Sequence, residues 1–465
     1  MSRARSVLII ATNTEKSPHP VYPLGASIVT SALVQGGYDV HGVDLCFLRE
    51  PRQVLEGTIA KLDPLFVGLS IRAVDNVSMI RNRVYLPAIK KVADVVRAAT
   101  DRPLVVGGSG YSLFPKLLLE SLGADYGIVG EGEKAVVALA DALRRGAVPI
   151  EMPGVYYRHG GRVYAGSPAA LLGAGEWCSP DYEVFPLSPY SAAGGVASVQ
   201  TRRGCSEVCA YCTYPLIEGR ACRLQHTGRI VGDFEAAMAR GVEDFFVTDS
   251  AFNLSEEHAL GVCAALKERR LDVRWSAFIA PRPRMERLAE AMASSGVRSV
   301  ELGSEGATMA ALRGLGKRHS TKMILDTDRC FREVGVTPAH YFIFGGPNET
   351  RDTIKEGLEL IDRLSGPIVV FLGVRIYPGT PIFRRAVREG VVHSVSDLLN
   401  PVFYFSDRVG WDWVLRELVE FGSSHDNFFV SGLELNHNGD FLERLRRRGR
   451  KGSLWEYVGH GPYST

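Results

Sequence analysis

The chain has 465 residues, of which 46% are hydrophobic and 23% are charged, and its formal net charge is +2. This length and composition are sufficient for two or three domains with buried cores, and the near-neutral charge gives no electrostatic case for nucleic-acid binding. No apolar run reaches the roughly 18 residues that a membrane span requires. Eight cysteines are too sparse for a disulfide framework, and no signal peptide precedes them, so we expect a cytoplasmic, reducing location.

The first 148 residues carry apolar runs that alternate with helical patterns. Such alternation is typical of α/β proteins with parallel strands, so we predict a doubly wound, Rossmann or flavodoxin-like domain over 1–148. An open sheet of this kind places its ligand at the carboxyl ends of its strands. The predicted strands are 6–10, 38–44, 65–70, 104–108 and 126–130. The residues at or just beyond the last three strand ends include Ser70, Gly107, Gly108, Gly130 and Glu131. No Gly-x-Gly-x-x-Gly follows the first strand, which argues against a dinucleotide ligand.

A second series of strands and helices covers 193–380, after a hairpin and a Pro- and Ser-rich linker at 149–192. We predict six strands in this region, and the first of them delivers a cysteine-rich loop at its carboxyl end. Active sites of βα barrels lie at that end of the strands. The predicted strands are 195–202, 244–248, 273–279, 298–303, 339–345 and 368–376.

The cysteine loop is the most informative motif of the chain. Cys205, Cys209 and Cys212 form a Cys-x3-Cys-x2-Cys run. Cysteine sulfurs hold iron–sulfur clusters, and a four-iron cubane normally takes four of them, so three ligands leave one iron open to another molecule. A structural zinc site is the alternative, but it needs four closed ligands, and the chain has no second Cys-x2-Cys pair.

The spacing of these cysteines, with Tyr211 just before the last one, resembles the cluster loop of the radical S-adenosylmethionine (SAM) superfamily. The resemblance implies a [4Fe–4S] cluster whose open iron binds SAM, and a partial (β/α)6 barrel over 193–380. It places Tyr211 near the adenine. It also implies an electron donor such as a flavodoxin or a ferredoxin.

The same resemblance suggests further SAM contacts at the strand ends. Asp249 or Ser250 stands where the family has a Gly-Gly-Glu motif, and simple capping of the strand end is the alternative role. Ser304 and Glu305 correspond to the segment that contacts the ribose. The glycine loop at Gly345–Gly346 is expected to pack near the adenine, whereas Glu349 beyond it is more typical of a helix start. Arg375 pairs either with a carboxylate of SAM or substrate or with a structural partner.

The first domain resembles the cobalamin-binding domain that many radical SAM enzymes carry. This resemblance rests on Pro23-Leu-Gly-Ala, on Gly107–Gly108 and on Gly130-Glu-Gly-Glu. It implies that Ser70, Gly107 and Gly108 line the nucleotide tail. The histidine of the Asp-x-His-x-x-Gly loop is missing, because 44–49 reads Asp-Leu-Cys-Phe-Leu-Arg. The alternative is a fold that persists without its corrinoid.

Residues 381–465 form a C-terminal extension with helical patterns and many aromatic side chains. They form either a lid over the substrate or the packed core of a small helical extension, which large aromatic residues also favour.

The combined resemblance implies a cobalamin-dependent radical SAM methyltransferase that cleaves SAM reductively and acts on an unactivated carbon of a small molecule. A radical SAM cyclase or isomerase, with or without cobalamin, is the alternative within the enzyme class, and a corrinoid or metal sensor is the alternative outside it. Radical chemistry of this kind requires no general base from the protein, and the sequence indicates no catalytic side chain.

Overall fold

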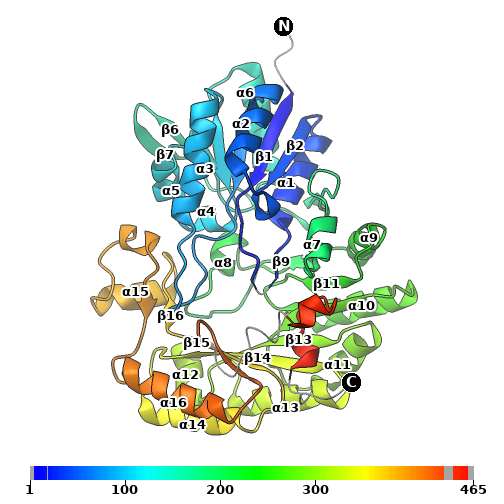
Figure 1. Ribbon diagram of the computed structural model, residues 1–465, viewed down its shortest axis with the longest axis vertical. Coiled ribbons are helices and arrows are strands. Elements are labelled where there is room, and N and C mark those ends of the chain that lie inside the picture. Colours follow the sequence, from blue (N-terminus) through cyan, green and yellow to red (C-terminus); the bar gives the residue numbers. More distant parts are fainter. Residues whose placement is uncertain (1–4, 18, 434–443, 459–465) are drawn as a thin grey trace. The chain divides into compact units, whose positions relative to one another are not determined.

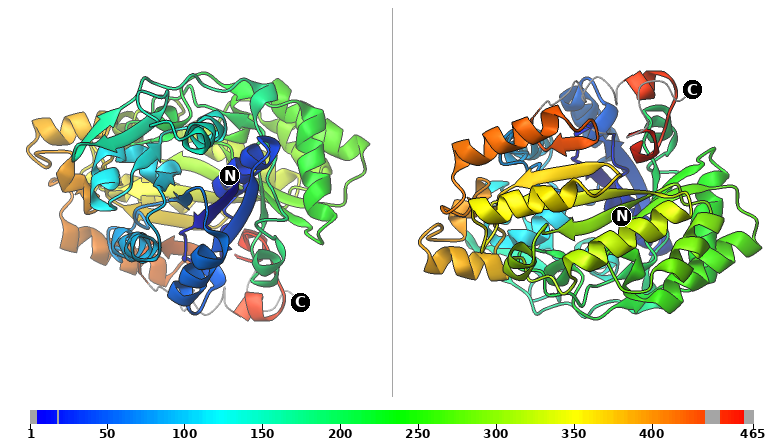
Figure 2. Two further views of the ribbon diagram at one scale, coloured as in Figure 1. Left: turned by 90° about the horizontal axis from the view of Figure 1, so that it is seen from above. Right: turned by 90° about the horizontal axis from the view of Figure 1, so that it is seen from below.

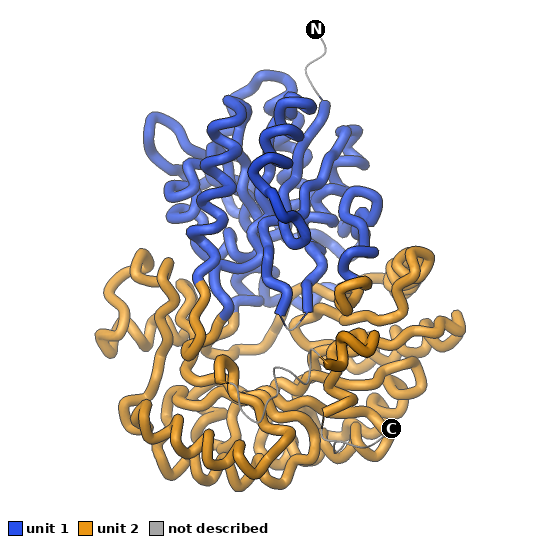
Figure 3. Tube along the Cα trace, viewed as in Figure 1, with its two compact units in different colours: residues 1–76, 84–190, 213–223 blue, residues 77–83, 191–212, 224–465 orange. Residues whose placement is uncertain are grey.

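The computed structural model describes residues 5–17, 19–433 and 444–458, and it contains two compact units (Figures 1 and 3). Unit 1 comprises 1–76, 84–190 and 213–223, and unit 2 comprises 77–83, 191–212 and 224–465. The hairpin and most of the linker predicted at 149–192 therefore belong to unit 1, as does a short segment that follows the cysteine loop. Each unit is built around its own sheet.

Unit 1 contains a seven-stranded sheet in the order β2-β1-β3-β4-β5-β6-β7. The first five strands run parallel, which confirms the predicted flavodoxin-like topology, and the hairpin β6–β7 continues the sheet antiparallel. In chain order the strands are β1 (Ser6–Ala11), β2 (Asp39–Asp44), β3 (Val67–Ser70), β4 (Leu104–Gly107), β5 (Tyr126–Ile128), β6 (Val155–His159) and β7 (Arg162–Ala165).

Helices connect the parallel strands of unit 1, and α1 packs on α6 while α2 packs on α3. Buried apolar positions on one face of each helix cover the sheet, as in α3 and α6. The helices are α1 (Leu24–Gln35), η1 (Leu45–Phe47), α2 (Pro51–Leu62), α3 (Leu86–Ala99), α4 (Ser109–Leu113), α5 (Pro115–Ser121), α6 (Glu133–Arg145), η2 (Ala174–Glu176), α7 (Ser188–Ala192) and α8 (Tyr214–Ile217).

Unit 2 contains a parallel seven-stranded sheet in the order β18-β15-β14-β13-β12-β11-β8. Six of these strands were predicted, and the C-terminal extension supplies the seventh, β18. The strands are β8 (Ala197–Val199), β11 (Asp244–Val247), β12 (Arg274–Ile279), β13 (Ser299–Glu305), β14 (Thr337–Phe344), β15 (Ile368–Leu372) and β18 (Phe428–Val430). The shorter strands are β9 (Arg202–Arg203), β10 (Arg223–Leu224), β16 (Val374–Arg375) and β17 (Phe403–Tyr404).

The strand predicted at 368–376 is interrupted at Gly373. This residue has a φ of +70°, and a Cβ there would lie 2.7 Å from the sulfur of Met79 and 3.2 Å from the carbonyl oxygen of Tyr404. Only glycine fits such a position without strain. Beyond the break, β16 leaves the main sheet and pairs antiparallel with β17.

Helices follow the strands of unit 2, and several of them begin at a side-chain cap. Ser255, Ser320 and Thr350 accept backbone N–H bonds at the starts of α10, α13 and α14. In the view from below, the yellow α14 and the orange α16 lie side by side (Figure 2). The helices are α9 (Thr227–Met238), η3 (Phe252–Leu254), α10 (Glu256–Glu268), α11 (Glu286–Ser294), α12 (Met309–Gly314), α13 (Thr321–Glu333), α14 (Arg351–Ile361), α15 (Pro381–Arg388), η4 (Ser396–Leu399), α16 (Trp411–Ser423) and η5 (Trp455–Tyr457).

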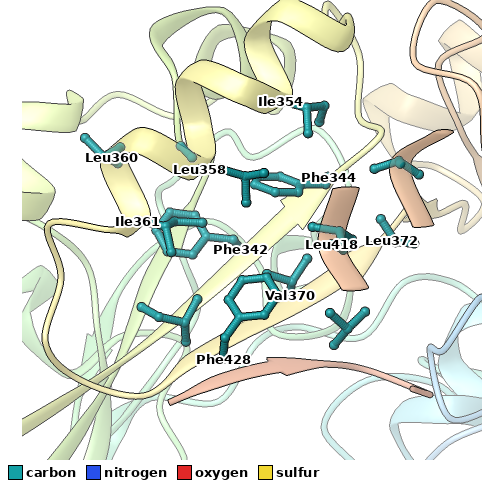
Figure 4. Packing of buried hydrophobic residues seen from close by; sticks show 14 of the residues in the cluster. Phe342, Phe344, Ile354, Leu358, Leu360, Ile361, Val370, Leu372, Leu418 and Phe428 are labelled. Carbon is teal, nitrogen blue, oxygen red and sulfur yellow. The ribbon is translucent and has the colours of Figure 1, made fainter. Parts of the chain in front are cut away.

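A hydrophobic core fills the space between β14, β15 and β18 and the helices α14 and α16 (Figure 4). Phe342 and Phe428 are fully buried at its centre, and Trp411 and Trp413 pack against it. Part of the C-terminal extension therefore contributes to the core of the main sheet. Within the described residues, no helix is both long and apolar enough to cross a membrane.

Replacing Phe342 with alanine is expected to lower the free energy of unfolding of unit 2 by about 3–5 kcal/mol, because it removes a buried ring from a packed core. Urea denaturation followed by circular dichroism measures this change. Val419→Ala on α16 is the control, since its side chain is 47% exposed. Equal stability losses in the two variants would contradict the description of this core.

Candidate active site

The start of the cysteine loop is held by a buried carboxylate at the end of β11. Asp249 is 1% exposed. Its Oδ1 accepts hydrogen bonds from the backbone N–H groups of Thr201 (2.8 Å) and Arg202 (3.2 Å), and its Oδ2 accepts one from the Thr201 hydroxyl (2.5 Å). Burial raises the pKa of Asp249, while Arg202 and these hydrogen bonds act in the opposite direction. The hydrogen bonds described for Asp249 all go to this loop.

Arg202 extends the same network to the loop after β11. Its Nε donates to the carbonyl oxygen of Ala251 (3.0 Å), and one terminal nitrogen donates to the hydroxyl of Ser250 (2.6 Å). Its other terminal nitrogen donates to the carbonyl oxygen of Gly204, which directly precedes the first cysteine (3.2 Å). The two residues predicted to meet the SAM amino group thus lie in a network that fixes the cysteine loop.

The cysteine loop is also held by backbone contacts from two other segments. The N–H of Ala210 donates to the carbonyl oxygen of Leu315, and the carbonyl oxygen of Ala210 accepts from the N–H of Ile382, both at 2.8 Å. Gly316 has a φ of +70°, and a Cβ there would lie 2.8 Å from the carbonyl oxygen of Val208. A glycine is required here because the loop passes so close to its backbone.

None of the three cysteines forms a disulfide, and they differ in exposure. Cys205 is buried, while Cys209 and Cys212 are partly exposed. No three His, Cys, Asp or Glu side chains in the described ranges converge closely enough to hold a single metal ion. The thiolates of an iron–sulfur cubane bind different irons rather than one. A loop that is held by backbone hydrogen bonds from two other segments and carries three cysteines outside any disulfide therefore suits a cluster.

An ion pair that the sequence did not suggest lies beside the cysteines. The Nζ of Lys317 is 3.6 Å from Oε1 of Glu305 and 5.5 Å from the ring centre of Tyr211. Burial lowers the pKa of Lys317, but Glu305 and Cys209 outweigh this effect and the net shift is upward. Burial raises the pKa of the Cys209 thiol, and Lys317 partly offsets that rise. A positive charge is thus fixed next to a cluster-type sulfur.

A cavity of about 240 Å³ is lined by residues of β12, β13, β14 and β15 of the unit 2 sheet and by residues of neighbouring segments. Tyr211, Glu305 and Arg375 contribute to its wall. The remaining wall is mainly apolar and aromatic, which is typical of a pocket for a small organic molecule. It consists of Val77, Phe278, Gly303, Tyr341, Ile343, Phe371, Gly373, Val374 and Tyr377.

Ser304 lies on the opposite face of β13 from Glu305. Its hydroxyl is 2.9 Å from Nδ1 of His340, and Nε2 of that histidine is 3.0 Å from Asp328. All three side chains are buried. This Ser–His–Asp chain is enclosed behind the sheet, and it packs the sheet against α13. Of the two residues predicted at the ribose, Glu305 is the one that reaches the cavity.

The glycine loop after β14 binds a carboxylate from its own chain. Oε2 of Glu349 accepts the N–H of Gly346 at 2.7 Å, and Gly345 contributes a further backbone hydrogen bond. Burial raises the pKa of Glu349 to about 8 despite these bonds. Gly345 has a φ of +82°, and the ring of Phe405 fills the position of a Cβ. Gly345 and Gly346 are therefore packed by Phe405 and Glu349.

Arg375 combines a cavity-lining position with structural hydrogen bonds. Its guanidinium donates to the carbonyl oxygens of Ile376 (2.6 Å) and Leu398 (2.9 Å), and it lies 4.6 Å from the ring centre of Tyr377. These contacts tie the segment beyond β16 to the wall of the cavity.

In unit 1 the predicted glycines stand at neighbouring strand ends. Gly108 has a φ of +100°, and a Cβ there would lie 2.5 Å from the carbonyl oxygen of Ile71. The hydroxyl of Ser112 accepts from the N–H of Gly130 (3.0 Å) and donates to the carbonyl oxygen of Gly108 (2.9 Å), which joins the β4 and β5 ends. Ser70 belongs to the same edge, where its carbonyl oxygen accepts from the Thr12 hydroxyl (2.9 Å).

Of the two glycines at the end of β4, Gly107 leaves space where a side chain would lie, whereas Gly108 does not. A Cβ at Gly107 would meet nothing closer than 3.6 Å, and the nearby Tyr111 carries a buried hydroxyl without a hydrogen-bond partner in the structure. Asp44, in the loop that carries a histidine in related domains, accepts from the hydroxyl of Tyr190 (2.7 Å). The residues present thus fit a corrinoid that is bound without a histidine from this loop.

Glu131 has a structural role within unit 1. Its carboxylate pairs with Arg223 at 2.7 Å and accepts the N–H of Leu172 at the same distance. Arg223 belongs to the segment that follows the cysteine loop, so this ion pair fastens that segment to unit 1.

The hydrogen bonds that Asp249 accepts from Thr201 and Arg202 lead to a test of cluster binding. Asp249→Asn replaces one acceptor oxygen with an N–H₂ group that faces the donors of Thr201 and Arg202, so we expect a loss of most of the iron bound per chain. Iron and sulfide analysis of anaerobically purified protein measures this loss. Asp272→Asn, at an exposed position before β12, is the control. Full iron content in Asp249→Asn would show that the carboxylate of Asp249 is not required for cluster binding.

Two family models match the chain, and each covers mainly one of the two units. Residues 10–140 match the B12-binding domain, and residues 199–361 match the radical SAM superfamily. The fold resembles that of the radical SAM methyltransferase TsrM from Kitasatospora setae, solved with cobalamin and a [4Fe–4S] cluster, with a TM-score of 0.88 and 24% identity over 98% of this chain and 97% of that one. It also resembles the cobalamin-dependent radical SAM enzyme OxsB, with a TM-score of 0.75 and 16% identity over 98% and 72%.

Curated relatives agree with these matches. The tryptophan 2-C-methyltransferase of Streptomyces laurentii is 29% identical over 81% of this chain and 74% of its own length. An uncharacterized methyltransferase of Pyrococcus horikoshii is 25% identical over 85% and 86%. The cluster loop, the corrinoid-type edge and these matches agree: the chain carries a B12-binding domain followed by a radical SAM domain, and it is similar to cobalamin-dependent radical SAM methyltransferases.

Proposed function

We propose that the enzyme transfers a methyl group to a ring carbon of an indole-type small molecule, with tryptophan or a close derivative as the substrate. The observation that carries this proposal is the aromatic wall of the unit 2 cavity. Phe278, Tyr341 and Phe371 offer flat apolar surfaces for a ring, and aromatic pairs add to the energy of burial. The relative from Streptomyces laurentii is a tryptophan methyltransferase, and one structure of TsrM holds tryptophan and a SAM analogue.

The polar side of the cavity suits the other reactant. Tyr211, Glu305 and Arg375 are polar residues of the wall, and Tyr211 belongs to the cysteine loop, so we assign them to SAM. In this proposal Tyr211 contacts the adenine, and Glu305 accepts hydrogen bonds from the ribose hydroxyls. Asp249, Ser250, Gly345 and Gly346 support the site by holding the loops that form it.

Unit 1 supplies the remaining cofactor site in this proposal. Ser70, Gly107, Gly108 and Gly130 would line the nucleotide tail of cobalamin, and Glu131 would keep the adjoining segment in place. When bound, cobalamin carries the methyl group, and the cluster exchanges electrons with a small donor such as a flavodoxin or a ferredoxin. The chain's own task is to orient the substrate ring and to exclude water from the reacting carbon.

Methyl transfer is tested with SAM labelled with deuterium in its methyl group. We expect anaerobically purified enzyme, loaded with about four irons and one cobalt per chain, to give C-methylated tryptophan that carries the label. Mass spectrometry of the product measures this transfer. Consumption of SAM with a rearranged or cyclised product in place of a methylated one would instead support the alternative radical enzyme.

The role of the cysteine loop is tested by single substitutions. Cys209→Ala is expected to abolish iron binding and methyl transfer, because a cubane with two protein thiolates is poorly held. Iron analysis and the visible absorption spectrum report the cluster. Cys222→Ala is the control, since Cys222 is exposed and lies outside the loop. Loss of iron in the control alone would contradict the assigned ligands.

A further inference from the structure

A short loop between β3 and α3 belongs to unit 2, although both of these elements belong to unit 1. This loop comprises residues 77–83. The two chain segments that lead into it and out of it are joined within unit 1, where Asp75 and Val84 form an antiparallel bridge. The N–H of Tyr85 also donates to the carbonyl oxygen of Val74 at 2.8 Å. The loop is therefore fixed at both of its ends.

Two glycines of unit 2 allow the same loop to pack closely against the sheet. A Cβ at Gly373, which follows β15, would lie 2.7 Å from the sulfur of Met79. Gly432, which follows β18, has a φ of +90°, and a Cβ there would lie 2.9 Å from the Cβ of Ile80 and from the hydroxyl oxygen of Ser78. Ile80 also packs against the hydrophobic core of unit 2. The loop is thus held in place along its length as well as at its ends.

The first residue of the loop, Val77, has a strained backbone. Its φ is +55°. Glycine adopts this left-handed conformation readily, whereas a β-branched residue does so rarely because its Cβ substituents crowd the backbone. Among the non-glycine residues with positive φ in the described ranges, Val77 is the only β-branched one. Strain of this kind persists where the surrounding structure imposes it, and it is concentrated at sites that bind ligands.

Val77 forms part of the wall of the unit 2 cavity. The residue is 43% exposed, so burial in a core does not account for a valine at this position. Glu305, with a φ of +65°, is a second residue of the wall that has a left-handed backbone. The strained backbone at Val77 therefore has a consequence for the cavity, because it places a branched apolar residue where a glycine would leave space.

The neighbours of Val77 place it at the β15 end of the cavity. Met79 lies against Gly373, directly after β15, and Phe371 of β15 lines the same wall. Phe278 comes from β12, which is separated from β15 by β13 and β14 in the sheet. An aromatic substrate that extends along this row of strands reaches Val77 at its β15 end.

Resting on the proposed function, we propose that Val77 determines which ring-substituted indoles the enzyme accepts. Its two methyl groups limit the size of the group that the substrate can carry at the end of the ring that points toward β15. Tryptophan fits this limit, and a tryptophan with an additional alkyl group at that end does not. One methylene more or less in an apolar pocket changes kcat/KM by about 10- to 200-fold, which is enough to separate such substrates.

The test uses tryptophan and a series of tryptophans that carry one methyl group, placed at each carbon of the benzene ring in turn. Transfer of a deuterated methyl group from labelled SAM gives kcat/KM for each. In Val77→Ala, the ratio of kcat/KM for at least one methylated substrate to that for tryptophan should rise about 10-fold over wild type. Iron and cobalt content should stay unchanged. Val391→Ala is the matched control, because Val391 is also 43% exposed and lies outside the cavity wall.

A second variant keeps the inference testable if Val77→Ala is poorly folded. Val77→Gly removes the whole side chain and adopts a positive φ without strain, so it should fold and accept the same methylated substrate at least as well. Wild-type ratios in the folded variants, or an equal rise in Val391→Ala, would overturn the inference. Failure of the wild-type enzyme to methylate tryptophan and every member of the series would instead refute the proposed function.

Discussion

The buried carboxylate of Asp249 is the constraint on which the catalytic half of the structure depends. A carboxylate without solvent must be satisfied by hydrogen bonds, and here the donors are the backbone N–H groups of Thr201 and Arg202 and the hydroxyl of Thr201. Those residues immediately precede the cysteine loop. The guanidinium of Arg202 in turn donates hydrogen bonds to the carbonyl oxygen of Gly204 and to the hydroxyl of Ser250. The position of the first cysteine is thus coupled to the end of the neighbouring strand, and the cost of burying one charge is offset by fixing a loop.

The site also shows how one sheet can carry two separate kinds of polar chemistry. Even-numbered residues of β13 and β14, such as Ser304 and His340, face the helices and satisfy one another in a closed network. Odd-numbered residues such as Glu301, Glu305 and Tyr341 lie on the opposite face of the sheet, where Glu305 and Tyr341 line the cavity. The alternation of a strand therefore separates groups that stabilise the fold from groups that are available to ligands.

Much of this arrangement could be predicted from the sequence, because it depends on local patterns. Apolar runs predicted the parallel strands of both sheets, and the cysteine spacing predicted the cluster loop. Other features depend on contacts between distant segments. The short β18 gains its strand character from pairing with β15. Lys317 follows a short helix rather than a strand, so the pattern of strand ends did not indicate it. The indole N–H of Trp455 donates to Glu301, and these two residues are 154 positions apart in sequence.

Because the chain passes several times between the two units, unit 1 and unit 2 cannot be separated by one cut of the backbone. The backbone crosses from one unit to the other at 76/77, 83/84, 190/191, 212/213 and 223/224. The segment 213–223 returns to unit 1 and is fastened there by the ion pair between Arg223 and Glu131. Each unit therefore consists of three separate segments of the chain. A chimera that joins this cobalamin domain to another barrel by simple end-to-end fusion would lack pieces of both, so the two must be exchanged as one block.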